Sequence, residues 1–333
     1  MAQAKAPVIK RNSIFRIIKD FRETNLIIII LALGVILSIA SPAFLTASNL
    51  RSVSVSFAID CIVVIGMSLV IISGGIDLSV GAVLALSCAL SAVLYKSGLP
   101  FIVCILAGVV ASLLCGLFNG YLISRQKMAP FIVTLAMMSI ARGICFILTT
   151  GSPISLVNQL PAGFKYLGSG SLFGFPIIVI IAMLIVIVAD ILFRKSPLLR
   201  QVYYSGSNEK AAIFSGIKVS KVKLLVYVFS SLLCGLAGLL FLSRFSYSSP
   251  VAGNGLELTM IAGCVIGGIS MEGGEGTVLG SVLGVIMLSL INNGLVLLNI
   301  SVYWQQFIGG VILISAVWLD YYRIRSRSKK LNA

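Results

Sequence analysis

Residues 206–217 read Gly-Ser-Asn-Glu-Lys-Ala-Ala-Ile-Phe-Ser-Gly-Ile and form the centre of the longest polar, basic interruption in the chain, residues 194–223. Taken as a helix from Asn208 at about 100° per residue, this stretch has two unlike faces. Short side chains make up one face, those of Asn208, Ala211, Ala212, Ser215 and Gly216. The other face carries Ile213, Phe214 and Ile217, with Lys210 among them. We expect the apolar face to lie on a membrane bundle and the small face to let the backbone of another protein approach. An amphipathic helix that only covers the membrane surface is the alternative interpretation.

The composition around this stretch is that of a membrane protein. Of the 333 residues, 59% are hydrophobic and 11% are charged, whereas soluble proteins carry roughly 25% charged residues. Apolar runs of spanning length, about 20 residues for a bilayer core of about 30 Å, recur along the chain. We therefore predict an all-α polytopic membrane protein with about ten transmembrane helices, at 26–40, 53–73, 78–95, 99–124, 130–149, 173–193, 224–243, 256–270, 278–298 and 302–319. The run at 256–270 is short for a full crossing and is expected to be broken or tilted.

The basic residues predict the orientation of these spans. One side of the ten-span arrangement carries 20 lysines and arginines and the other side carries four. Because basic loops stay on the cytoplasmic side, both termini and the 194–223 loop are predicted to be cytoplasmic. The net charge of +15 is then a sign of topology and not of a nucleic-acid partner. The expected organisation is a basic cytoplasmic segment at 1–24, a single transmembrane domain at 25–320 and a basic cytoplasmic tail at 321–333.

Several classes of site lack the residues they need. The sequence has no histidine, which excludes histidine metal sites and histidine-based catalytic triads. Its seven cysteines all lie in apolar runs without a Cys-x-x-Cys pair, so we interpret them as small apolar side chains. No Gly-x-x-x-x-Gly-Lys-[Ser/Thr] occurs, so the chain does not bind ATP through a P-loop. We therefore expect no catalytic residue, no metal and no cofactor bound by this chain.

A second unusual stretch, Ser-Gly-Gly-Ile-Asp-Leu-Ser-Val-Gly, covers residues 73–81 and falls between the second and third predicted spans. Two adjacent glycines, Gly74 and Gly75, permit a helix break, and the carboxylate of Asp77 could cap the next helix. Ser79 and Gly81 complete the string. The prediction places it at a cytoplasmic turn, where a purely structural role is the alternative to a functional one.

Three motifs together resemble the ribose/xylose/arabinose-type sugar permeases of bacterial ATP-binding-cassette importers. Ala211-Ala212-x-x-x-Gly216, within Gly-x-Asn-x-x-Ala-Ala-x-x-Ser-Gly-Ile, resembles the cytoplasmic coupling loop of such permeases, although the Ile-x-Leu-Pro ending of the widest motif is missing and Glu209 stands one residue further from the alanine pair. The string Gly-Gly-Ile-Asp-Leu-Ser-Val-Gly at 74–81 resembles their signature. Residues 292–320 contain Asn-Asn-Gly-Leu, Tyr-Trp-Gln-Gln-Phe and Trp-Leu-Asp, and they resemble the C-terminal part of these permeases.

The resemblance implies a permease subunit in the bacterial inner membrane that imports a monosaccharide and is not itself an enzyme. It implies a cytoplasmic ATPase subunit, which binds ATP and magnesium, an extracytoplasmic sugar-binding protein and a second permease subunit. The residues expected to couple to the ATPase are Gly206, Asn208, Glu209, Ala211, Ala212, Ser215 and Gly216. The sequence does not name the sugar.

Two further questions stay open at the level of sequence. The amides of Asn292, Asn293, Gln305 and Gln306 lie near the outer ends of the last two spans, where they would either line a sugar pathway or bond to neighbouring helices. The charges Asp60, Arg142 and Asp190 fall in apolar runs, where they would pair, reach water or face a cavity. The rival function is a secondary transporter that uses Asp60 or Asp190 to couple transport to an ion gradient. A third possibility, an intramembrane enzyme, is disfavoured because the sequence has no histidine and no convincing nucleophile–base set.

Overall fold

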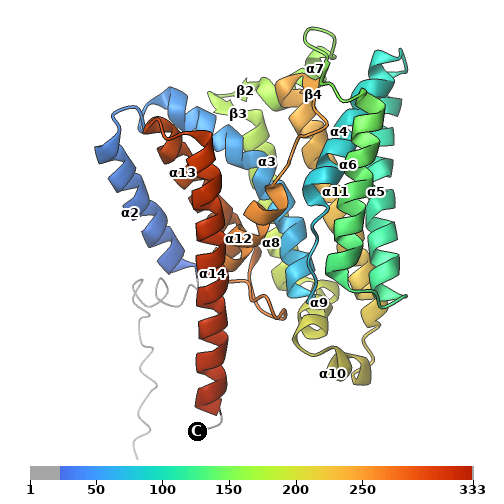
Figure 1. The fold of residues 1–333 in the computed structure, drawn as a ribbon, viewed down its shortest axis with the longest axis vertical. Helices are drawn as coiled ribbons and strands as arrows, with labels where there is room; N and C mark the ends of the chain where they lie inside the picture. Colours follow the sequence, from blue (N-terminus) through green and yellow to red (C-terminus); the bar gives the residue numbers. More distant parts are fainter. Residues whose placement is uncertain (1–22, 332–333) are drawn as a thin grey trace, which may run out of the picture.

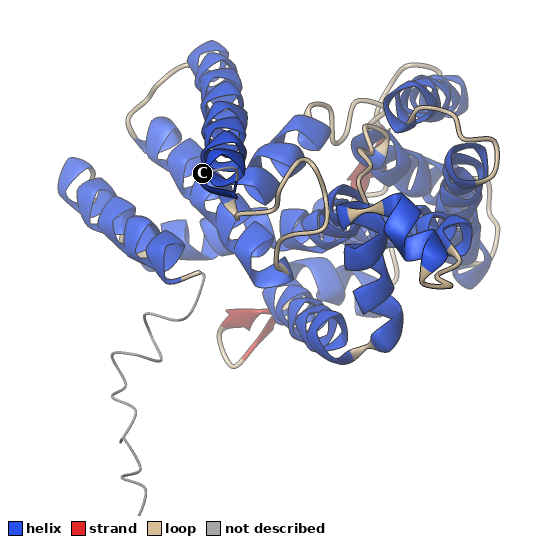
Figure 2. Cartoon of the chain, turned by 90° about the horizontal axis from the view of Figure 1, so that it is seen from below, coloured by secondary structure: helices blue, strands red, loops and turns tan. Residues whose placement is uncertain are grey.

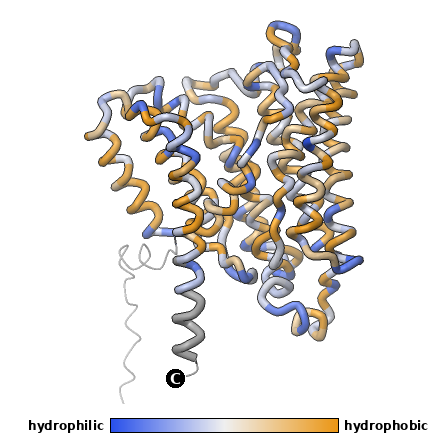
Figure 3. The backbone as a smooth tube through the Cα atoms, in the orientation of Figure 1, coloured by the Kyte–Doolittle hydropathy of each residue, from blue (hydrophilic) through white to orange (hydrophobic). Residues whose placement is uncertain are grey.

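The structure is a computed structural model of the chain, and it describes residues 23–331. Within this range the protein is an all-α polytopic membrane protein with a few two-residue strands. Seven helices are long and apolar enough to cross a membrane, namely α3 (Ala47–Ile72), α5 (Phe101–Ser124), α6 (Pro130–Thr149), α8 (Ile177–Lys195), α11 (Val219–Phe245), α13 (Val278–Leu297) and α14 (Val302–Leu331). Three shorter apolar helices are α2 (Thr24–Ala40), α4 (Val80–Lys96) and α12 (Leu256–Ile266). These helices correspond one to one with the predicted apolar runs, and orange hydrophobic segments dominate the backbone in Figure 3.

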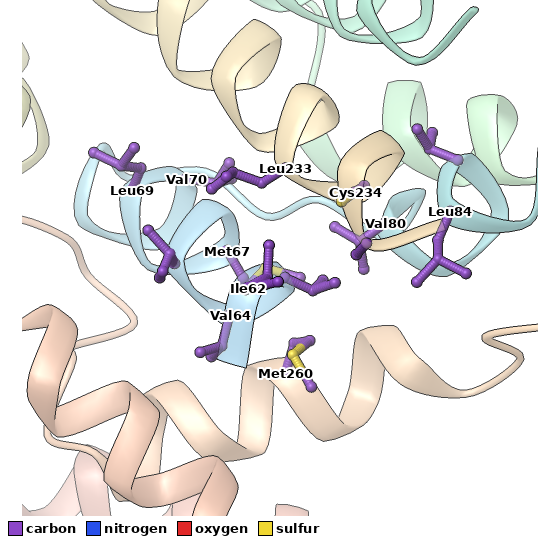
Figure 4. Close-up of a cluster of buried hydrophobic side chains, with 14 of the residues drawn as sticks. Ile62, Val64, Met67, Leu69, Val70, Val80, Leu84, Leu233, Cys234 and Met260 are labelled. Atoms are coloured by element: carbon purple, nitrogen blue, oxygen red, sulfur yellow. The ribbon is translucent and has the colours of Figure 1, made fainter. Parts of the chain in front are cut away.

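Helix α3 is the centre of the bundle. Every residue from Cys61 to Ile72 is buried, as expected for a helix that is apolar on all sides. It packs against α11, α13, α8 and α12. Figure 4 shows its side chains, among them Ile62 and Met67, meeting Leu233 of α11, Val80 of α4 and Met260 of α12. By contrast, α5, α6 and α8 keep many large apolar side chains exposed, which suits helices that face lipid.

Small residues bring α11 very close to its neighbours. A Cβ added at Gly66 of α3 would lie 2.8 Å from the Cα of Ser230, and one added at Gly116 of α5 would lie 2.8 Å from the Cβ of Ser231. Such approaches are typical of membrane helices, which associate through close packing of small residues and not through the hydrophobic effect. They fix α11 between α3 and α5.

The chain does not make a surface turn between α3 and α4. Residues 73–79 instead run back along the bundle from the lower end of α3, and α4 begins well inside it (Figure 1). Ser230, which bonds to Asp77, lies eleven residues into α11, or about 16 Å from its start. The prediction of a cytoplasmic turn at 73–81 is therefore wrong. Non-helical backbone at membrane depth is tolerated only where protein covers it, and Ser73, Asp77 and Ser79 are indeed buried.

The prediction that the run at 256–270 is too short for a full crossing is confirmed, because α12 ends at Ile266 after only 11 residues. An irregular segment, residues 249–255, leads into it from the opposite end of the bundle (Figure 1). Within residues 23–331 the bundle thus has two broken crossings, α4 and α12, each preceded by irregular backbone. Such discontinuous helices are a feature of membrane transporters.

At the upper end in Figure 1, the Gly-, Ser- and Pro-rich loop after α6 contains regular structure. Strand β1 (Ile154–Ser155) pairs antiparallel with β4 (Tyr247–Ser248), helix α7 (Ala162–Ser169) follows, and β2 (Ser171–Leu172) pairs with β3 (Phe175–Pro176). Figure 2 shows how little of the chain these strands occupy. Residues 1–22 of the predicted basic segment lie outside the described residues, whereas the predicted tail from residue 321 continues α14 as far as Leu331.

Candidate functional site

The 194–223 loop folds into two short helices at the lower end of the bundle, α9 (Pro197–Ser207) and α10 (Glu209–Phe214) (Figure 1). Between them Asn208 is extended, and its side chain accepts a hydrogen bond from the backbone N–H of Ala211 at 3.0 Å, as an N-cap does. Gly216 has a φ of 82°, the left-handed conformation in which glycine terminates helices. The predicted helix therefore starts where expected but is only six residues long.

The orientation predicted for this helix is right for most of its small face, because Asn208, Ala211, Ser215 and Gly216 are exposed as expected. It is wrong for the apolar face. Ala212, from the small face, is only 4% exposed, whereas Phe214 is 91% exposed and Ile213 is 53% exposed. The helix ends before Ile217, so the three apolar residues do not form one stripe. Helix α10 lies below the bundle in Figure 1, and no helix covers Phe214. The exposed surface of α10 thus combines small side chains with the large apolar ones of Ile213 and Phe214. An exposed aromatic side chain of this kind is typical of an anchor at a protein interface.

Glu209 holds α10 in place. Its carboxylate accepts from the Nζ of Lys223 of α11 at 2.6 Å and from the Nζ of Lys127, in the loop before α6, at 3.1 Å. The hydrogen bond from Lys223 lowers the pKa of Glu209, and the bond from Lys127 adds to this effect. The residue was predicted to take part in coupling, and the structure places it as a tie between α10 and the bundle.

Three glycine-containing segments meet where the 194–223 loop touches the bundle. A Cβ on Gly206 would overlap the carbonyl oxygen of Ile72, the last residue of α3. The same oxygen accepts from the N–H of Gly274 at 2.8 Å, and a Cβ on Gly273 would lie 3.0 Å from the backbone of Gly74. The loop is therefore packed directly on the start of the 73–81 string, so a shift of α9 would reach the broken crossing.

The remaining residues of that string hold residues 73–79, the re-entrant segment, inside the protein. Asp77 Oδ1 accepts from the N–H of Ser79 at 2.9 Å and from its hydroxyl at 2.6 Å, and Oδ2 accepts from the hydroxyl of Ser230 at 3.4 Å. Asn119 of α5 donates to the Ser79 hydroxyl at 3.1 Å. Asp77 thus bonds to the N-cap residue and does not cap the first turn of α4. Asn119 and Ser230 were not among the predicted residues, and their only signal in the sequence is a polar side chain inside an apolar run.

The two broken crossings touch each other. A Cβ on Gly81, in the first turn of α4, would overlap the carbonyl oxygen of Gly253, just before α12. Arg142 of α6 donates to the carbonyl oxygens of Pro250 and Ala252, both at 2.7 Å. The question left open for Arg142 is answered, because it satisfies backbone groups of the segment before α12. The contact between Gly81 and Gly253 couples the segments that enter from opposite ends.

The candidate pathway amides do not form one group. Asn293 of α13 exchanges two hydrogen bonds with Asn49 of α3, at 2.9 and 3.1 Å. Gln305 donates to the carbonyl oxygen of Ile300 at 3.0 Å, while Asn292 and Gln306 are exposed. Within residues 23–331 no hydrogen bond joins the asparagines to the glutamines. Their arrangement is consistent with helix packing for Asn293.

Of the other two charges in apolar runs, only Asp190 has a side-chain ion pair within residues 23–331. Asp190 pairs with Arg194, one turn further along α8, at 2.7 Å. Arg244 of α11 donates to the carbonyl oxygen of Val55 at 2.8 Å. Val55 lies on α3, one to two turns before Asp60. All seven cysteines are buried and unpaired.

Taken together, the bundle of apolar helices, the two broken crossings and the exposed 194–223 loop are features of a membrane permease. Comparison with known proteins agrees. The model of the family described as "Branched-chain amino acid transport system / permease component" matches residues 49–317, and the chain belongs to this family.

Relatives named as permeases are similar to this chain over most of the length of both proteins. The chain is 41% identical to the ribose import permease protein of Bacillus subtilis (strain 168) over 288 residues, which cover 86% of this chain and 89% of the relative. It is 36% identical to the ribose import permease protein of Escherichia coli (strain K12), over 90% of this chain and 93% of the relative. It is 33% identical to an L-arabinose ABC transporter permease protein of Azospirillum brasilense, over 97% and 94%. No solved structure matches the chain.

Proposed function

We propose that this chain is the membrane-spanning subunit of an ATP-driven importer for a monosaccharide of the ribose, arabinose or allose kind. The observation that carries the proposal is identity of 41% and 36% to two ribose import permeases over nearly the whole length of both chains. Relatives named for L-arabinose and D-allose widen the range of sugars within the same chemistry. The chain supplies the pathway, and a partner ATPase hydrolyses ATP with magnesium.

The 194–223 loop is the element that receives this ATPase. Its exposed side chains, Phe214 and Ile213, supply the apolar anchor, and Glu209 keeps the helix that carries them attached to the bundle. Gly206 passes the movement to Ile72 and the re-entrant segment. ATP binding and hydrolysis would thereby act on the two broken crossings, which form the moving part of the pathway.

The same function requires three further features. A sugar-binding protein delivers the substrate from outside, and a second permease subunit completes the pathway. The chain crosses the bacterial inner membrane ten times with both termini in the cytoplasm, since 20 of the lysines and arginines lie on that side against four on the other. Single cysteines in a cysteine-free version test the orientation. An impermeant reagent should label Gly163→Cys from outside and should not label Ser207→Cys.

The decisive experiment is transport by reconstituted vesicles. Uptake of radiolabelled ribose, arabinose or allose is measured with the purified permease, its ATPase and its binding protein. We expect uptake that requires ATP and is unchanged when proton and sodium gradients are collapsed. Uptake driven by an ion gradient without ATP would instead support the secondary transporter, in which Asp60 is the better candidate, because Asp190 is already paired with Arg194.

The route of the sugar can be probed separately. Gln306 is exposed on α14 near the outer end and can donate to and accept from sugar hydroxyls, whereas Asn293 is already paired with Asn49. We assign the pathway role to Asn292, Gln305 and Gln306 ahead of Asn293. Slower uptake in Gln306→Leu, with unchanged abundance and unchanged binding of the ATPase, is the expected result.

A further inference from the structure

A large groove lies on the side of the bundle next to the 194–223 loop. Its volume is about 800 Å³, and it runs between α8 and α11, with Leu69 of α3 at its floor. The start of α9 and residues 215–217 close its lower end. The groove therefore touches the proposed docking element directly.

The walls of the groove are apolar and open on one side. Leu192 of α8 is 46% exposed, Leu198 of α9 is 71% exposed and Leu225 of α11 is 61% exposed. Phe229 continues the stripe along α11, one turn after Leu225. On a chain that spans a membrane, such a surface is bathed in hydrocarbon, so an acyl chain is the occupant that its chemistry fits.

The lower end of the same stripe is basic. Lys218 and Lys221 line the groove, and they also line an adjoining hollow together with Arg125. Among the described residues no salt bridge involves these three, whereas Lys127 and Lys223 nearby are both paired with Glu209. No acidic side chain lines the groove. Three cations without partners at the end of an apolar groove complement an anionic group.

The dimensions match one leaflet of a bilayer. From Lys221 to Leu232, the last lining residue of α11, there are eleven residues, or about 16 Å of helix. Half of a bilayer core of about 30 Å is about 15 Å. A phospholipid with its headgroup at the lysines would thus lay one acyl chain along the stripe as far as the bilayer midplane.

We propose that this groove binds one anionic phospholipid from the leaflet next to the 194–223 loop. The lysines bind the phosphate, the acyl chain fills the space between α8 and α11, and the lipid braces residues 215–217. The inference rests on the chain being a membrane permease and not on which sugar it carries. A second copy of the chain fits less well, because a two-fold axis through the groove would place the two sets of lysines against each other.

Photolabelling in bilayers tests the proposal. The full-length permease is reconstituted in phosphatidylcholine that contains a trace of phosphatidylglycerol with a diazirine in its acyl chain, and labelled peptides are mapped by mass spectrometry. We expect labels within residues 189–202 and 219–232, displaced by unlabelled phosphatidylglycerol but not by phosphatidylcholine. Each lysine near an anionic surface contributes about fivefold in affinity. Lys218→Gln with Lys221→Gln should therefore raise the concentration of unlabelled phosphatidylglycerol that displaces half of the label about 25-fold.

Three controls make the result decisive. Lys96→Gln with Lys165→Gln removes the same charge at the other end of the bundle and should change nothing. Lys218→Arg with Lys221→Arg keeps the charge and should retain the label. Labelling that is unaffected by the glutamine pair, or equal labelling by a phosphatidylcholine probe, would overturn the proposal. So would a crosslink between two permease chains from a photoreactive residue at position 225. None of these readouts depends on transport.

Discussion

Phe214 offers the sharpest test of how this permease meets its ATPase. The side chain is 91% exposed, so nearly all of its surface is available to a partner. Complete burial of a phenylalanine side chain contributes about 1.5–3 kcal/mol, and aromatic anchors at interfaces cost at least about 2 kcal/mol when truncated. Phe214→Ala should therefore weaken binding of the ATPase by about 2–3 kcal/mol, which raises Kd about 30- to 150-fold.

The assay is equilibrium binding of the purified ATPase subunit to the permease in nanodiscs, followed by uptake. Because Phe214 makes so little contact within the chain, its removal should leave the Tm of the permease alone unchanged. Phe173→Ala is the matched control, since Phe173 is 94% exposed at the opposite end of the bundle. A change in Kd below about threefold for Phe214→Ala, or an equal loss for the control, would show that the ATPase docks elsewhere.

Three other predictions concern the parts that surround this contact. Glu209→Gln should speed hydrogen exchange in α10, because it weakens two half-exposed ion pairs of about 0.2–1 kcal/mol each. Since hydrogen bonding lowers the pKa of Glu209, this stabilisation is complete above the ordinary glutamate pKa and is lost as pH falls through the lowered value. After correction for the intrinsic pH dependence of amide exchange, the protection of α10 in the wild type should therefore fall in acid, whereas its protection in the glutamine variant should not change. Gly81→Ala should lower Tm, because its Cβ would overlap the carbonyl of Gly253 and overpacking costs about 1–3 kcal/mol; Gly163→Ala, in open space, should not. Gln306→Leu should slow uptake at saturating binding protein, and unaltered uptake would remove it from the pathway.

The error over α10 has a simple physical origin. A helical projection treats residues 208–217 as one continuous helix, and on that basis it puts Ile213, Phe214 and Ile217 on one face. The real helix stops at Phe214, so no apolar stripe forms, and Ile213 and Phe214 stay exposed although Glu209 ties the short helix to Lys223. Rotation about the helix axis depends on partners distant in the sequence, which periodicity cannot contain.

The re-entrant segment was missed for a related reason. Gly74 and Gly75 mark a break in the helix, but a break does not say whether the chain leaves the membrane or turns back inside it. What keeps residues 73–79 inside is a set of bonds from other helices, from Ser230, Asn119 and Thr134. These partners lie 40 or more residues away along the chain.

Hydrophobicity is a property of neighbouring residues, so the sequence was enough to predict the class of fold, the apolar crossings, the place of the polar loop and the start of its short helix at Asn208. The motif strings also pointed to the family. The tertiary structure was needed to show that Ile213 and Phe214 of α10 are exposed, that Gly81 meets Gly253 inside the bundle, and that α8 and α11 leave a groove between them. Each of these depends on how helices far apart in the chain pack together, and packing follows from shape and from hydrogen bonds between distant residues.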